Sequence, residues 1–362
     1  MICFINRSTV DYDIRLQKYV QACMETNTPY CVIGWDRLRN CSKIYPNEHQ
    51  YHAYSPYGNG LKSIFPLIGW VFFVLYNLIK LKKQYEVIHA CNMENCLISF
   101  PAKWFGKKLV LDIYDSERPK IERRLVKILD GTILPSTQRI EQIGTTIESI
   151  HNYLEIENVP VIKRLESLKR EVEFPEKIHL SYVGVFQSQC RGLENLISLV
   201  NSDERILLDI AGTGGGLDQL VKEASINNSR INYYGKVEYP QALSIMGNSD
   251  FIVALYYLVD KDHIYASPNK YYESLALGKP IITSKGTLVG NNVDKNNTGY
   301  IIEDSIDALK NLFKNIGSKE FKDHYYTKSM NCRSLWEKTY STYFDKSLKE
   351  RYIRYMKAIV TK

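Results

Sequence analysis

The sequence lacks the cysteine pattern of a metal site or a disulfide framework, and we expect neither a secretory leader nor an internal repeat in it. Its eight cysteines are scattered without a C-x-x-C pair, which argues against a zinc knuckle and against a disulfide-stapled domain. Residues 1–6 are apolar over too short a stretch, and lack the cationic lead, to form a signal sequence. No period of about 20–50 residues is visible, which argues against a solenoid. We therefore expect a folded protein in a reducing, cytoplasmic setting.

The sequence also lacks an apolar run long enough to cross a bilayer comfortably. The longest run, residues 64–79, falls short of the roughly 20 residues of a spanning helix and is followed by Lys80, Lys82 and Lys83. A buried helix of the first domain is the simpler explanation of the run. A helix lying in the lipid interface, with its lysines at anionic headgroups, is the second. Both interpretations stay open at this point.

Length and charge limit the domain count and the kind of partner. A chain of 362 residues exceeds what one hydrophobic core usually serves, so two domains are expected. The formal net charge of +7 suits a nucleoside diphosphate, a lipid phosphate or an acidic membrane face, and does not choose among them. We expect no nucleic acid partner.

Short apolar strands alternate with helix-length segments in both halves of the chain. In the first half, strands are predicted at 2–6, 30–35, 86–91, 108–115 and 131–136, and helices at 11–26, 61–83, 93–106 and 119–130. In the second half, strands are predicted at 179–185, 205–212, 231–235, 251–257, 280–284 and 299–303, with helices between them. Strands that are apolar on both faces are typical of a parallel sheet covered by helices on both sides.

A charge-rich stretch separates the two halves. Residues 154–178 carry Pro160 and Pro175 and interrupt the alternation, so they are the best linker candidate. From Ser334 onward the sequence has no strand pattern and is predicted to be helical. We therefore predict an α/β protein with doubly wound domains at 1–165 and 166–332 and a helical segment at 333–362.

Residues 267–282 carry the most information about function. Pro268 suits a first helical turn, and a glycine and a proline at the far end stop the helix before a buried strand. Free amides and the axial dipole at such a helix start favour an anion, and Lys270 adds a full charge. Glu273 lies one turn further, where a carboxylate can accept hydrogen bonds from ribose hydroxyls. A solvated lysine and glutamate on an ordinary capped helix is the alternative.

This stretch resembles the nucleotide-binding signature of retaining glycosyltransferases with the GT-B fold, specifically the large family four. Residues 182–184, the pair Arg191-Gly192, and residues 208–212 and 231–237 resemble the first three strands of that family's donor domain, in the required order. The resemblance implies two Rossmann-like parallel-sheet domains facing across a cleft, an acceptor-binding one and a donor-binding one. It also implies a C-terminal helical segment that packs back on the N-terminal domain.

The resemblance implies a donor site in the C-terminal domain. Arg191 would grip the β-phosphate with two parallel hydrogen bonds, and Lys270 would share the charge of the leaving group. The donor-binding residues implied in this way are Gly184, Arg191, Gly235, Val237, Ser267, Pro268, Asn269, Lys270 and Glu273.

In the N-terminal half the matches are looser and point to the acceptor. Arg7, Asp11 and His89 are the implied acceptor-binding residues, and His89 would orient an acceptor hydroxyl or the donor sugar. A histidine packed at a strand end is the alternative for His89. Asp115 would accept the acceptor's proton, or else cap the next turn. His89, Asp115, Arg191 and Lys270 are thus the implied catalytic residues.

A basic run follows the last of these matches. It consists of Arg118, Lys120, Arg123, Arg124 and Lys127. Such a run is more often a solvated helix face than a contact for a membrane or a phosphate, and both are kept as interpretations.

The reaction implied by the resemblance is sugar transfer with retained anomeric configuration, by front-face displacement and without a divalent metal. The donor would be a nucleotide sugar such as a UDP- or GDP-sugar, and the acceptor a saccharide or a lipid-linked oligosaccharide. The implied setting is assembly of bacterial capsule, exopolysaccharide or lipopolysaccharide in the cytoplasm, with peripheral contact at the anionic inner face of the plasma membrane.

Two departures from the family pattern and three rival functions stay in view. Tyr265 stands where many members carry a second glutamate, and Val185 where many carry an arginine, so the donor's identity is open. A nucleotide-dependent oxidoreductase is disfavoured because Leu217 stands where the dinucleotide fingerprint needs its third glycine. The second rival is an epimerase or hydrolase that acts on sugar nucleotides, and the third is a two-domain sugar-binding protein without catalysis.

Overall fold

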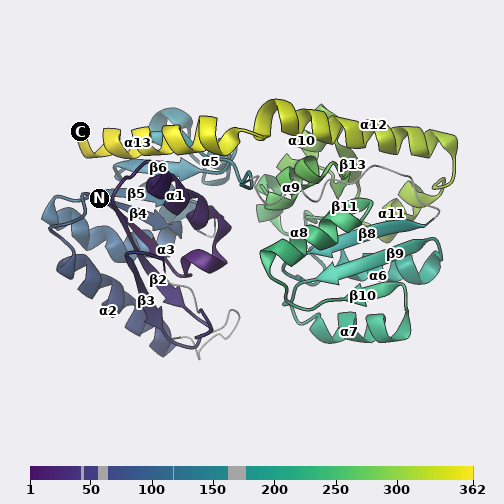
Figure 1. Ribbon diagram of the computed structural model, residues 1–362, viewed down its shortest axis with the longest axis horizontal. Helices are drawn as coiled ribbons and strands as arrows, with labels where there is room; N and C mark the ends of the chain where they lie inside the picture. Colours follow the sequence, from purple (N-terminus) through teal and green to yellow (C-terminus); the bar gives the residue numbers. More distant parts are fainter. Residues whose placement is uncertain (42–44, 56–63, 117, 162–176, 362) are drawn as a thin grey trace. The chain divides into compact units, whose positions relative to one another are not determined.

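The computed structural model describes residues 1–41, 45–55, 64–116, 118–161 and 177–361, which form two compact units (Figure 1). The first unit combines Met1–Glu157 with Tyr343–Lys362, and the second is Asn158–Thr342. Each unit contains one parallel sheet with helices on both faces, so the predicted Rossmann-like architecture is confirmed.

The first unit is built on a seven-stranded sheet of order β3-β2-β1-β4-β5-β6-β7, and every neighbouring pair is parallel. The central strands are buried on both faces, which explains their nearly continuous apolar sequences. The strands are β1 (Ile2–Asn6), β2 (Tyr30–Asp36), β3 (Glu48–His52), β4 (Val87–Cys91), β5 (Lys108–Asp112), β6 (Gly131–Leu134) and β7 (Tyr153–Glu155).

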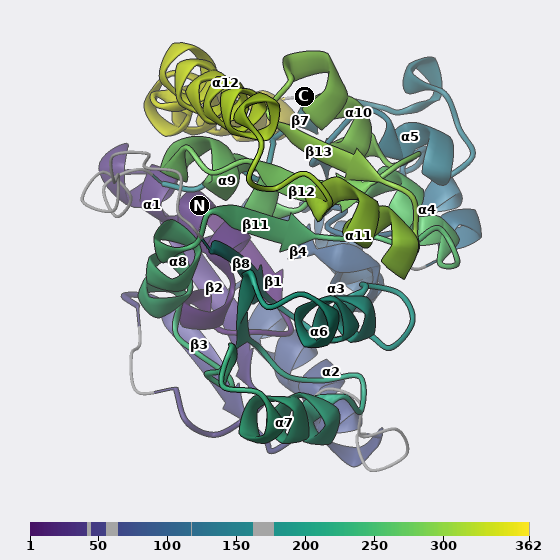
Figure 2. The same cartoon turned by 90° about the vertical axis from the view of Figure 1, so that its right-hand side faces the viewer.

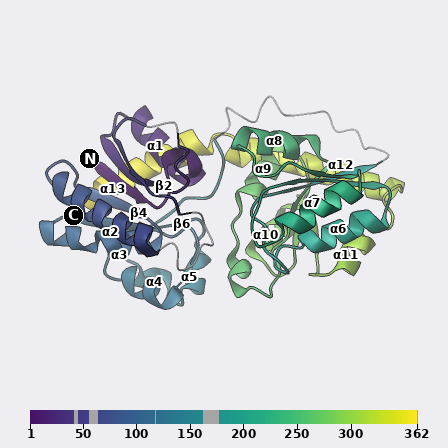
Figure 3. The ribbon, with the colours of Figure 1, turned by 90° about the horizontal axis from the view of Figure 1, so that it is seen from below.

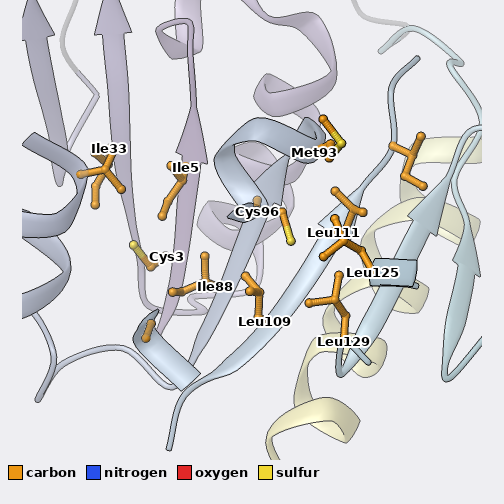
Figure 4. Packing of buried hydrophobic residues seen from close by; sticks show 14 of the residues in the cluster. Cys3, Ile5, Ile33, Ile88, Met93, Cys96, Leu109, Leu111, Leu125 and Leu129 are labelled. Atoms are coloured by element: carbon orange, nitrogen blue, oxygen red, sulfur yellow. The ribbon is translucent and has the colours of Figure 1, made fainter. Parts of the chain in front are cut away.

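Helices cover both faces of this sheet. Figure 3 shows α1 (Ile14–Glu25) and α13 (Glu350–Thr361) on one side, and α2 (Ile64–Lys80), α3 (Asn92–Ser99) and α4 (Pro119–Leu125) on the other. Apolar side chains of α3 and the segment around α4 pack on those of the sheet, such as Ile5, Ile88 and Leu111 (Figure 4). In the described ranges no helix is both long and apolar enough to cross a membrane.

Two strands of this sheet were missed by the sequence pattern. β3 and β7 occupy the two edges, where one side of the strand has no neighbour. β3 is polar and only partly buried, and β7 is three residues long. Edge strands need less apolar sequence than central ones, so neither gave a clear strand signal.

The second unit has a six-stranded parallel sheet of order β10-β9-β8-β11-β12-β13. Figure 2 shows α8 (Tyr239–Asn248) and α9 (Asn269–Leu277) on one side, and α6 (Leu193–Ser202) and α11 (Ile306–Phe313) on the other. The strands are β8 (Ile178–Val183), β9 (Ile206–Ala211), β10 (Ile231–Tyr233), β11 (Phe251–Ala254), β12 (Ile281–Ser284) and β13 (Gly299–Ile302). The other helices are α7 (Asp218–Asn227), α10 (Leu288–Asn296) and α12 (Lys319–Leu335).

Local signals in the sequence set several helix ends. Ser305 and Ser318 each accept a hydrogen bond from a backbone amide of the helix that follows, α11 and α12 respectively. Such N-caps contribute about 1 kcal/mol each. Gly278 ends α9 in the left-handed conformation, with φ of 67°, which a residue with a Cβ adopts only with strain.

The chain returns to the first unit after α12, as predicted for the C-terminal helical segment. Residues from Tyr343 onward belong to the first unit, and α13 packs beside α1. Tyr352 of α13 is fully buried, and its hydroxyl lies 2.9 Å from Nδ1 of His89 in β4. The last helix is therefore part of the first unit's core.

A buried charge network lies beneath this helix. Arg15 of α1 bonds Asp112 at the end of β5 through Nε, at 3.0 Å, and through a terminal nitrogen, at 2.9 Å. His89 Nε2 lies 3.3 Å from the same carboxylate. Burial opposes ionisation of Asp112, but the Arg15 charge and the His89 hydrogen bond outweigh it and lower the pKa of Asp112 to about 2. The carboxylate therefore stays charged inside the unit.

Replacing this carboxylate is expected to destabilise the first unit. Asp112→Asn should lower its free energy of unfolding by about 3–5 kcal/mol, because the Arg15 charge would stay buried without its partner. Urea unfolding followed by tryptophan fluorescence measures the change, since three of the four tryptophans, Trp35, Trp70 and Trp104, belong to this unit and only Trp336 to the second.

The control variant is Glu303→Gln, which breaks an exposed pair with Lys285 in the second unit and should leave this transition in place. Because the pKa of Asp112 is lowered, its contribution is complete above about pH 4 and is lost as the pH falls through about 2. An unchanged urea midpoint in Asp112→Asn would show that the network contributes nothing to stability.

Candidate functional site

The strand order of the second unit reverses between β8 and β11. From β8 the chain continues outward to β9 and β10, and from β11 it continues in the other direction to β12 and β13. Because all strands are parallel, their carboxyl ends lie at one edge of the sheet. Ligands of doubly wound folds bind in the crevice at such a reversal, where the loops diverge.

Lys270 and Arg191 meet at this reversal. Lys270 lies in the first turn of α9, and its Nζ is 2.9 Å from the point where a Cβ on Gly184, just after β8, would stand. The same Nζ lies 6.0 Å from the ring centre of Tyr182 in β8. Arg191, in the loop between β8 and α6, is close enough to influence the charge of both Lys270 and Tyr182. Two cations therefore share one partly buried place.

This shared place depresses the basicity of the lysine. Burial first, and then the positive charge of Arg191, lower the pKa of Lys270 to about 8, and the nearby Glu273 opposes the shift only in part. Two positive charges held close together in a partly buried site repel each other, and a bound anion lowers the free energy of that arrangement. The geometry therefore favours binding of a phosphate or diphosphate group.

Arg191 is held by neutral groups that the sequence pattern did not identify. Its Nε donates to Oε1 of Gln187 at 3.1 Å, and its guanidinium carbon lies 5.0 Å from the ring centre of Tyr256. Gln187 in turn donates from Nε2 to Asp260 Oδ2 at 3.3 Å. No sequence motif marks these contacts, because they join the loops after β8 and β11.

Glu273 is placed differently from the other candidates. It is buried within α9, and its Oε1 accepts a hydrogen bond from the hydroxyl of Tyr239, in α8, at 2.8 Å. The alternative of a solvated glutamate is therefore excluded by its burial. Its contact with a ribose stays a prediction.

The turn that enters α9 leaves helix amides at the sheet edge. Pro268 is the N-cap, one position before the first helical turn in which it was predicted, and Tyr271 N bonds to the carbonyl of Pro268 at 3.2 Å. The amides of Asn269 and Lys270 precede that bond, where a helix offers no internal acceptor. The carbonyl of Ser267 accepts from Asn158 Nδ2 at 2.9 Å, which fixes the turn.

Glycines form the corners after the first three strands of this unit. Gly184 N donates to the carbonyl of Ala211, and Gly212 N donates to the carbonyl of Gly235, each at 2.8 Å. Gly212 has φ of 138°, and a Cβ there would lie 1.8 Å from the carbonyl oxygen of Gly184. Only glycine allows this approach of the two loops. Val237 follows in the next loop and is partly buried.

In the first unit the strand order reverses between β1 and β4, and Arg7 lies there. Its guanidinium is 3.9 Å from Glu94 Oε1, in α3, and both side chains are partly exposed. Asp11 lies in a short 3-10 helix, Val10–Tyr12, where its backbone carbonyl accepts from Gln17 Nε2 at 2.9 Å. Arg7 is thus at the edge where a ligand of this unit is expected, and acceptor binding by both residues stays a prediction.

His89 lies deeper in its strand than expected, whereas Asp115 lies at the surface, and the catalytic role of each stays a prediction. His89 lies inside β4 rather than at its end, is fully buried, and uses both ring nitrogens within the Tyr352 and Asp112 contacts described above. This placement favours the alternative of a packed histidine, because sheet and α13 cover it. Asp115 is exposed and lies 3.1 Å from the buried Arg139, so it is charge-paired at the surface.

Two aspartates of the kind that could hold a hard cation are used as helix caps instead. The sequence contains two Asp-x-Asp runs, at 11–13 and 260–262, and one aspartate of each caps a helix: Asp13 caps α1 and Asp260 caps the 3-10 helix Lys261–Tyr265. Among all the residues that the structure describes, no three histidine, cysteine, aspartate or glutamate side chains converge as metal ligands. The metal independence implied by the resemblance stays a prediction.

Comparison with protein families gives one match. Residues 164–330 match the family described as glycosyl transferases group 1. The matched segment contains the reversal between β8 and β11 and the Arg191–Lys270 pair. A search of curated proteins by sequence found no match.

Solved structures with the same fold span almost the whole chain. Sucrose-phosphate synthase from Thermosynechococcus elongatus has a TM-score of 0.73 at 14% identity and covers 99% of both chains. HepE from Anabaena, in complex with UDP-glucose, has 0.68 at 14% and covers 98% of this chain and 99% of its own. The lipopolysaccharide outer core galactosyltransferase WaaB has 0.64 at 16% and covers 99% of both. Identities this low show the fold, and the predicted GT-B fold is confirmed.

Removing either charged candidate on α9 is expected to weaken nucleotide binding. Lys270→Ala should weaken the binding of UDP or GDP by about tenfold or more, because a hydrogen bond to a charged group contributes about 1.5–3 kcal/mol. Glu273→Ala should act in the same direction through the ribose. Titration calorimetry measures both, and Lys295→Ala, an exposed lysine on α10, is the matched control.

The pH dependence separates a charge contact from a packing effect. Since the pKa of Lys270 is about 8, raising the pH from 7 to 9 should weaken wild-type binding by about tenfold as the ammonium loses its proton. Lys270→Gln should show no such fall. Unchanged nucleotide affinity in both alanine variants would contradict the assignment of α9.

Proposed function

We propose a specific reaction for this chain, which is a glycosyltransferase. Its residues 164–330 match the family described as glycosyl transferases group 1. It moves a sugar from a nucleoside diphosphate donor to a saccharide or lipid-linked acceptor, and the anomeric configuration is retained. The observation that carries the proposal is the convergence of Arg191, Lys270 and the amino end of α9 at the reversal between β8 and β11.

The proposed chemistry follows from where charge develops. As the bond between sugar and diphosphate breaks, positive charge grows on the sugar ring and negative charge on the leaving phosphate. Arg191, Lys270 and the first amides of α9 stabilise that leaving charge from fixed positions, which is usually the largest catalytic contribution of such a site. The leaving phosphate itself then takes the proton of the acceptor hydroxyl, in a front-face displacement.

The same charges make a resident metal unnecessary in this proposal. Two cations and a helix end supply the positive potential that a divalent ion supplies in other diphosphate sites. The neutral partners of Arg191, Gln187 and Tyr256, leave its charge uncancelled. We therefore propose transfer without a divalent cation.

Donor identity is set around positions that depart from the family pattern. Tyr265 ends the 3-10 helix before α9, where it is partly buried, and Val185 is exposed just after β8. Tyr265 accepts a hydrogen bond from a sugar hydroxyl less strongly than the glutamate of other members, and Val185 cannot donate to a phosphate as their arginine does. HepE is solved with UDP-glucose, and we propose a UDP- or GDP-sugar as donor here.

The acceptor and the setting complete the proposal. WaaB, a lipopolysaccharide outer core galactosyltransferase, shares this fold. We place this chain in bacterial surface polysaccharide assembly in the cytoplasm, at the inner face of the plasma membrane. The acceptor there is a growing saccharide or its lipid-linked form.

A two-stage experiment tests the function. A panel of sugar nucleotides should contain one that raises the melting temperature, because a ligand that binds only the folded state stabilises it. With that donor and a saccharide or lipid-linked acceptor, proton NMR of the product should show the donor's anomeric configuration, and excess chelator should leave the rate unchanged.

Different outcomes identify the rivals. Release of free sugar without transfer would indicate a hydrolase, and a changed sugar on the same nucleotide an epimerase. Stabilisation by free sugars with no response to any nucleotide would indicate a sugar-binding protein. An inverted product would refute retention, and inhibition by chelator would refute metal independence.

A further inference from the structure

The outward side of α2 exposes a continuous apolar stripe. Trp70, Val74 and Leu78 face the core, yet the opposite side is apolar as well. Phe65 is 83% exposed and Phe72 is 68% exposed. The exposed side chains that recur every three or four residues, as one face of a helix requires, are Phe65, Ile68, Phe72, Tyr76 and Ile79, and Ile64 and Leu67 beside them are exposed as well.

Two further aromatic side chains extend this stripe. Trp104 and Phe105 end the 3-10 helix Phe100–Phe105 that follows α3, and Trp104 is 82% exposed. Lys82, just after α2, places its Nζ 5.5 Å from the ring centre of Phe105. The carboxyl end of α2 therefore lies beside this aromatic corner. Neither aromatic was singled out by the sequence analysis, since they fall outside the long apolar run.

Cations border the stripe on the same side of the sheet. Lys80 ends α2, Lys82 and Lys83 follow it, and all three are exposed. On the side of the sheet that α2, α3 and α4 cover (Figure 3), the basic run of α4 is also fully on the surface. None of its five cations takes part in an ion pair within the described part of the chain: Arg118, Lys120, Arg123, Arg124 and Lys127.

The charge decides what covers this surface. A second copy of the chain docked face to face would bring lysines and arginines against their own kind, which disfavours a symmetric pair. An anionic bilayer satisfies both features at once. Apolar side chains enter the interface, tryptophan prefers the headgroup level, and lysine and arginine meet anionic lipid.

We infer that the outer surface of α2, the Trp104 corner and α4 is a docking surface for anionic lipid. This inference rests on the proposed function only for the purpose of the surface, which is to bring the acceptor-binding unit to a lipid-linked acceptor. Binding to lipid itself requires neither donor nor catalysis. The sixteen-residue run that the sequence left open, residues 64–79, is thus both a core helix on one side and an interfacial helix on the other.

Vesicle flotation tests the surface. The full chain should float with vesicles that mix phosphatidylglycerol and phosphatidylcholine at low salt, and much less with pure phosphatidylcholine or at about 0.5 M salt. Phe72→Glu and Trp104→Glu should each reduce the bound fraction. Arg123→Ala and Lys127→Ala should each weaken partitioning, up to about fivefold where the side chain reaches the headgroups.

The matched control is Ile226→Glu, at a side chain of α7 that is 72% exposed in the second unit, and it should float like wild type. Nucleotide affinity of Phe72→Glu should equal that of wild type, which separates this test from that of the proposed function. Failure of the wild type to float would overturn the inference. So would an equal loss in Ile226→Glu, or a dimer in solution that Phe72→Glu dissociates.

A different observation carries a second inference, about the arginine of the donor site. Gln187 bridges Arg191 Nε and Asp260 through its two amide atoms. Asp260 is itself held near His263, whose Nε2 lies 3.7 Å away and whose Nδ1 lies 2.9 Å from the carbonyl of Tyr257. The chain Asp260–Gln187–Arg191 therefore fixes one edge of the guanidinium from the loop after β11.

We propose that Gln187 and Asp260 are positioning residues that aim the terminal nitrogens of Arg191 at the leaving diphosphate. The proposal rests on the proposed function, which gives Arg191 that task. Gln187 uses its oxygen toward the arginine and its amide toward the carboxylate, so the bridge works in one orientation only. Aiming affects an interaction that strengthens in the transition state more than it affects binding of the donor.

Steady-state kinetics tests the bridge. Gln187→Ala should lower kcat about tenfold with little change in KM, the signature of an interaction made in the transition state. In an Arg191→Ala background it should have no further effect, because the two residues act as one unit. Gln219→Ala, an exposed glutamine on α7, is the control and should keep wild-type kinetics.

Reversing the polarity of the bridge gives a rescue. Gln187→Glu alone should lower kcat, since its carboxylate faces Asp260, and adding Asp260→Asn should restore most of it. Additive losses in the double variant, or an unchanged kcat in Gln187→Ala, would overturn the positioning role. Absence of turnover in the wild type would instead count against the proposed function.

Discussion

Parallel strand order is the constraint on which the rest of this structure depends. Within each unit the described strands are all parallel to one another, so the carboxyl ends of that unit's sheet lie at one edge of the sheet, and the strand order reverses once among its central strands. At a reversal the loops that follow the two adjacent strands run in opposite directions. Doubly wound folds bind their ligands in the crevice between such loops. In the second unit the reversal brings the start of α9 beside Gly184, with the Lys270 ammonium next to that glycine. Residues far apart in the sequence, Arg191 and Lys270, meet there for that reason.

Two buried or half-buried arginines show how partners decide a role. Arg15 is matched by Asp112 and by the carbonyl of Ile156, and it serves the stability of the first unit. Arg191 is held by a neutral amide and an aromatic ring, and its neighbour Lys270 is positive as well. A charge without a counter-charge in a partly buried place has a free energy cost that an anionic ligand relieves. The first arrangement suits a core, and the second suits a binding site.

The returning C-terminal helix changes the meaning of the first unit's polar residues. α13 covers the face of the sheet where His89 projects, and Tyr352 completes its hydrogen bonds. A histidine that the sequence places among acceptor-facing residues is thereby enclosed. On the opposite face of the sheet α2 is enclosed on one side only, since the apolar side chains on its outward side, such as Phe65 and Phe72, are exposed. Both outcomes follow from which helix covers which face, and periodicity within one segment does not contain that information.

The sequence by itself determined the two parallel sheets, most central strands and the helix at 269–277 with its lysine and glutamate, because apolar strands and helix-ending residues are local signals. The sequence did not predict the edge strands β3 and β7, because a strand at the edge of a sheet is less buried and therefore needs fewer apolar residues. Only the tertiary structure decided that Gln187, Tyr256 and Tyr239 surround the donor-site candidates, and that His89 is enclosed. These contacts join loops and helices distant in the chain. The free energy of these contacts depends on which residues become neighbours in the folded chain. The spacing of residues within one strand or helix does not specify those neighbours.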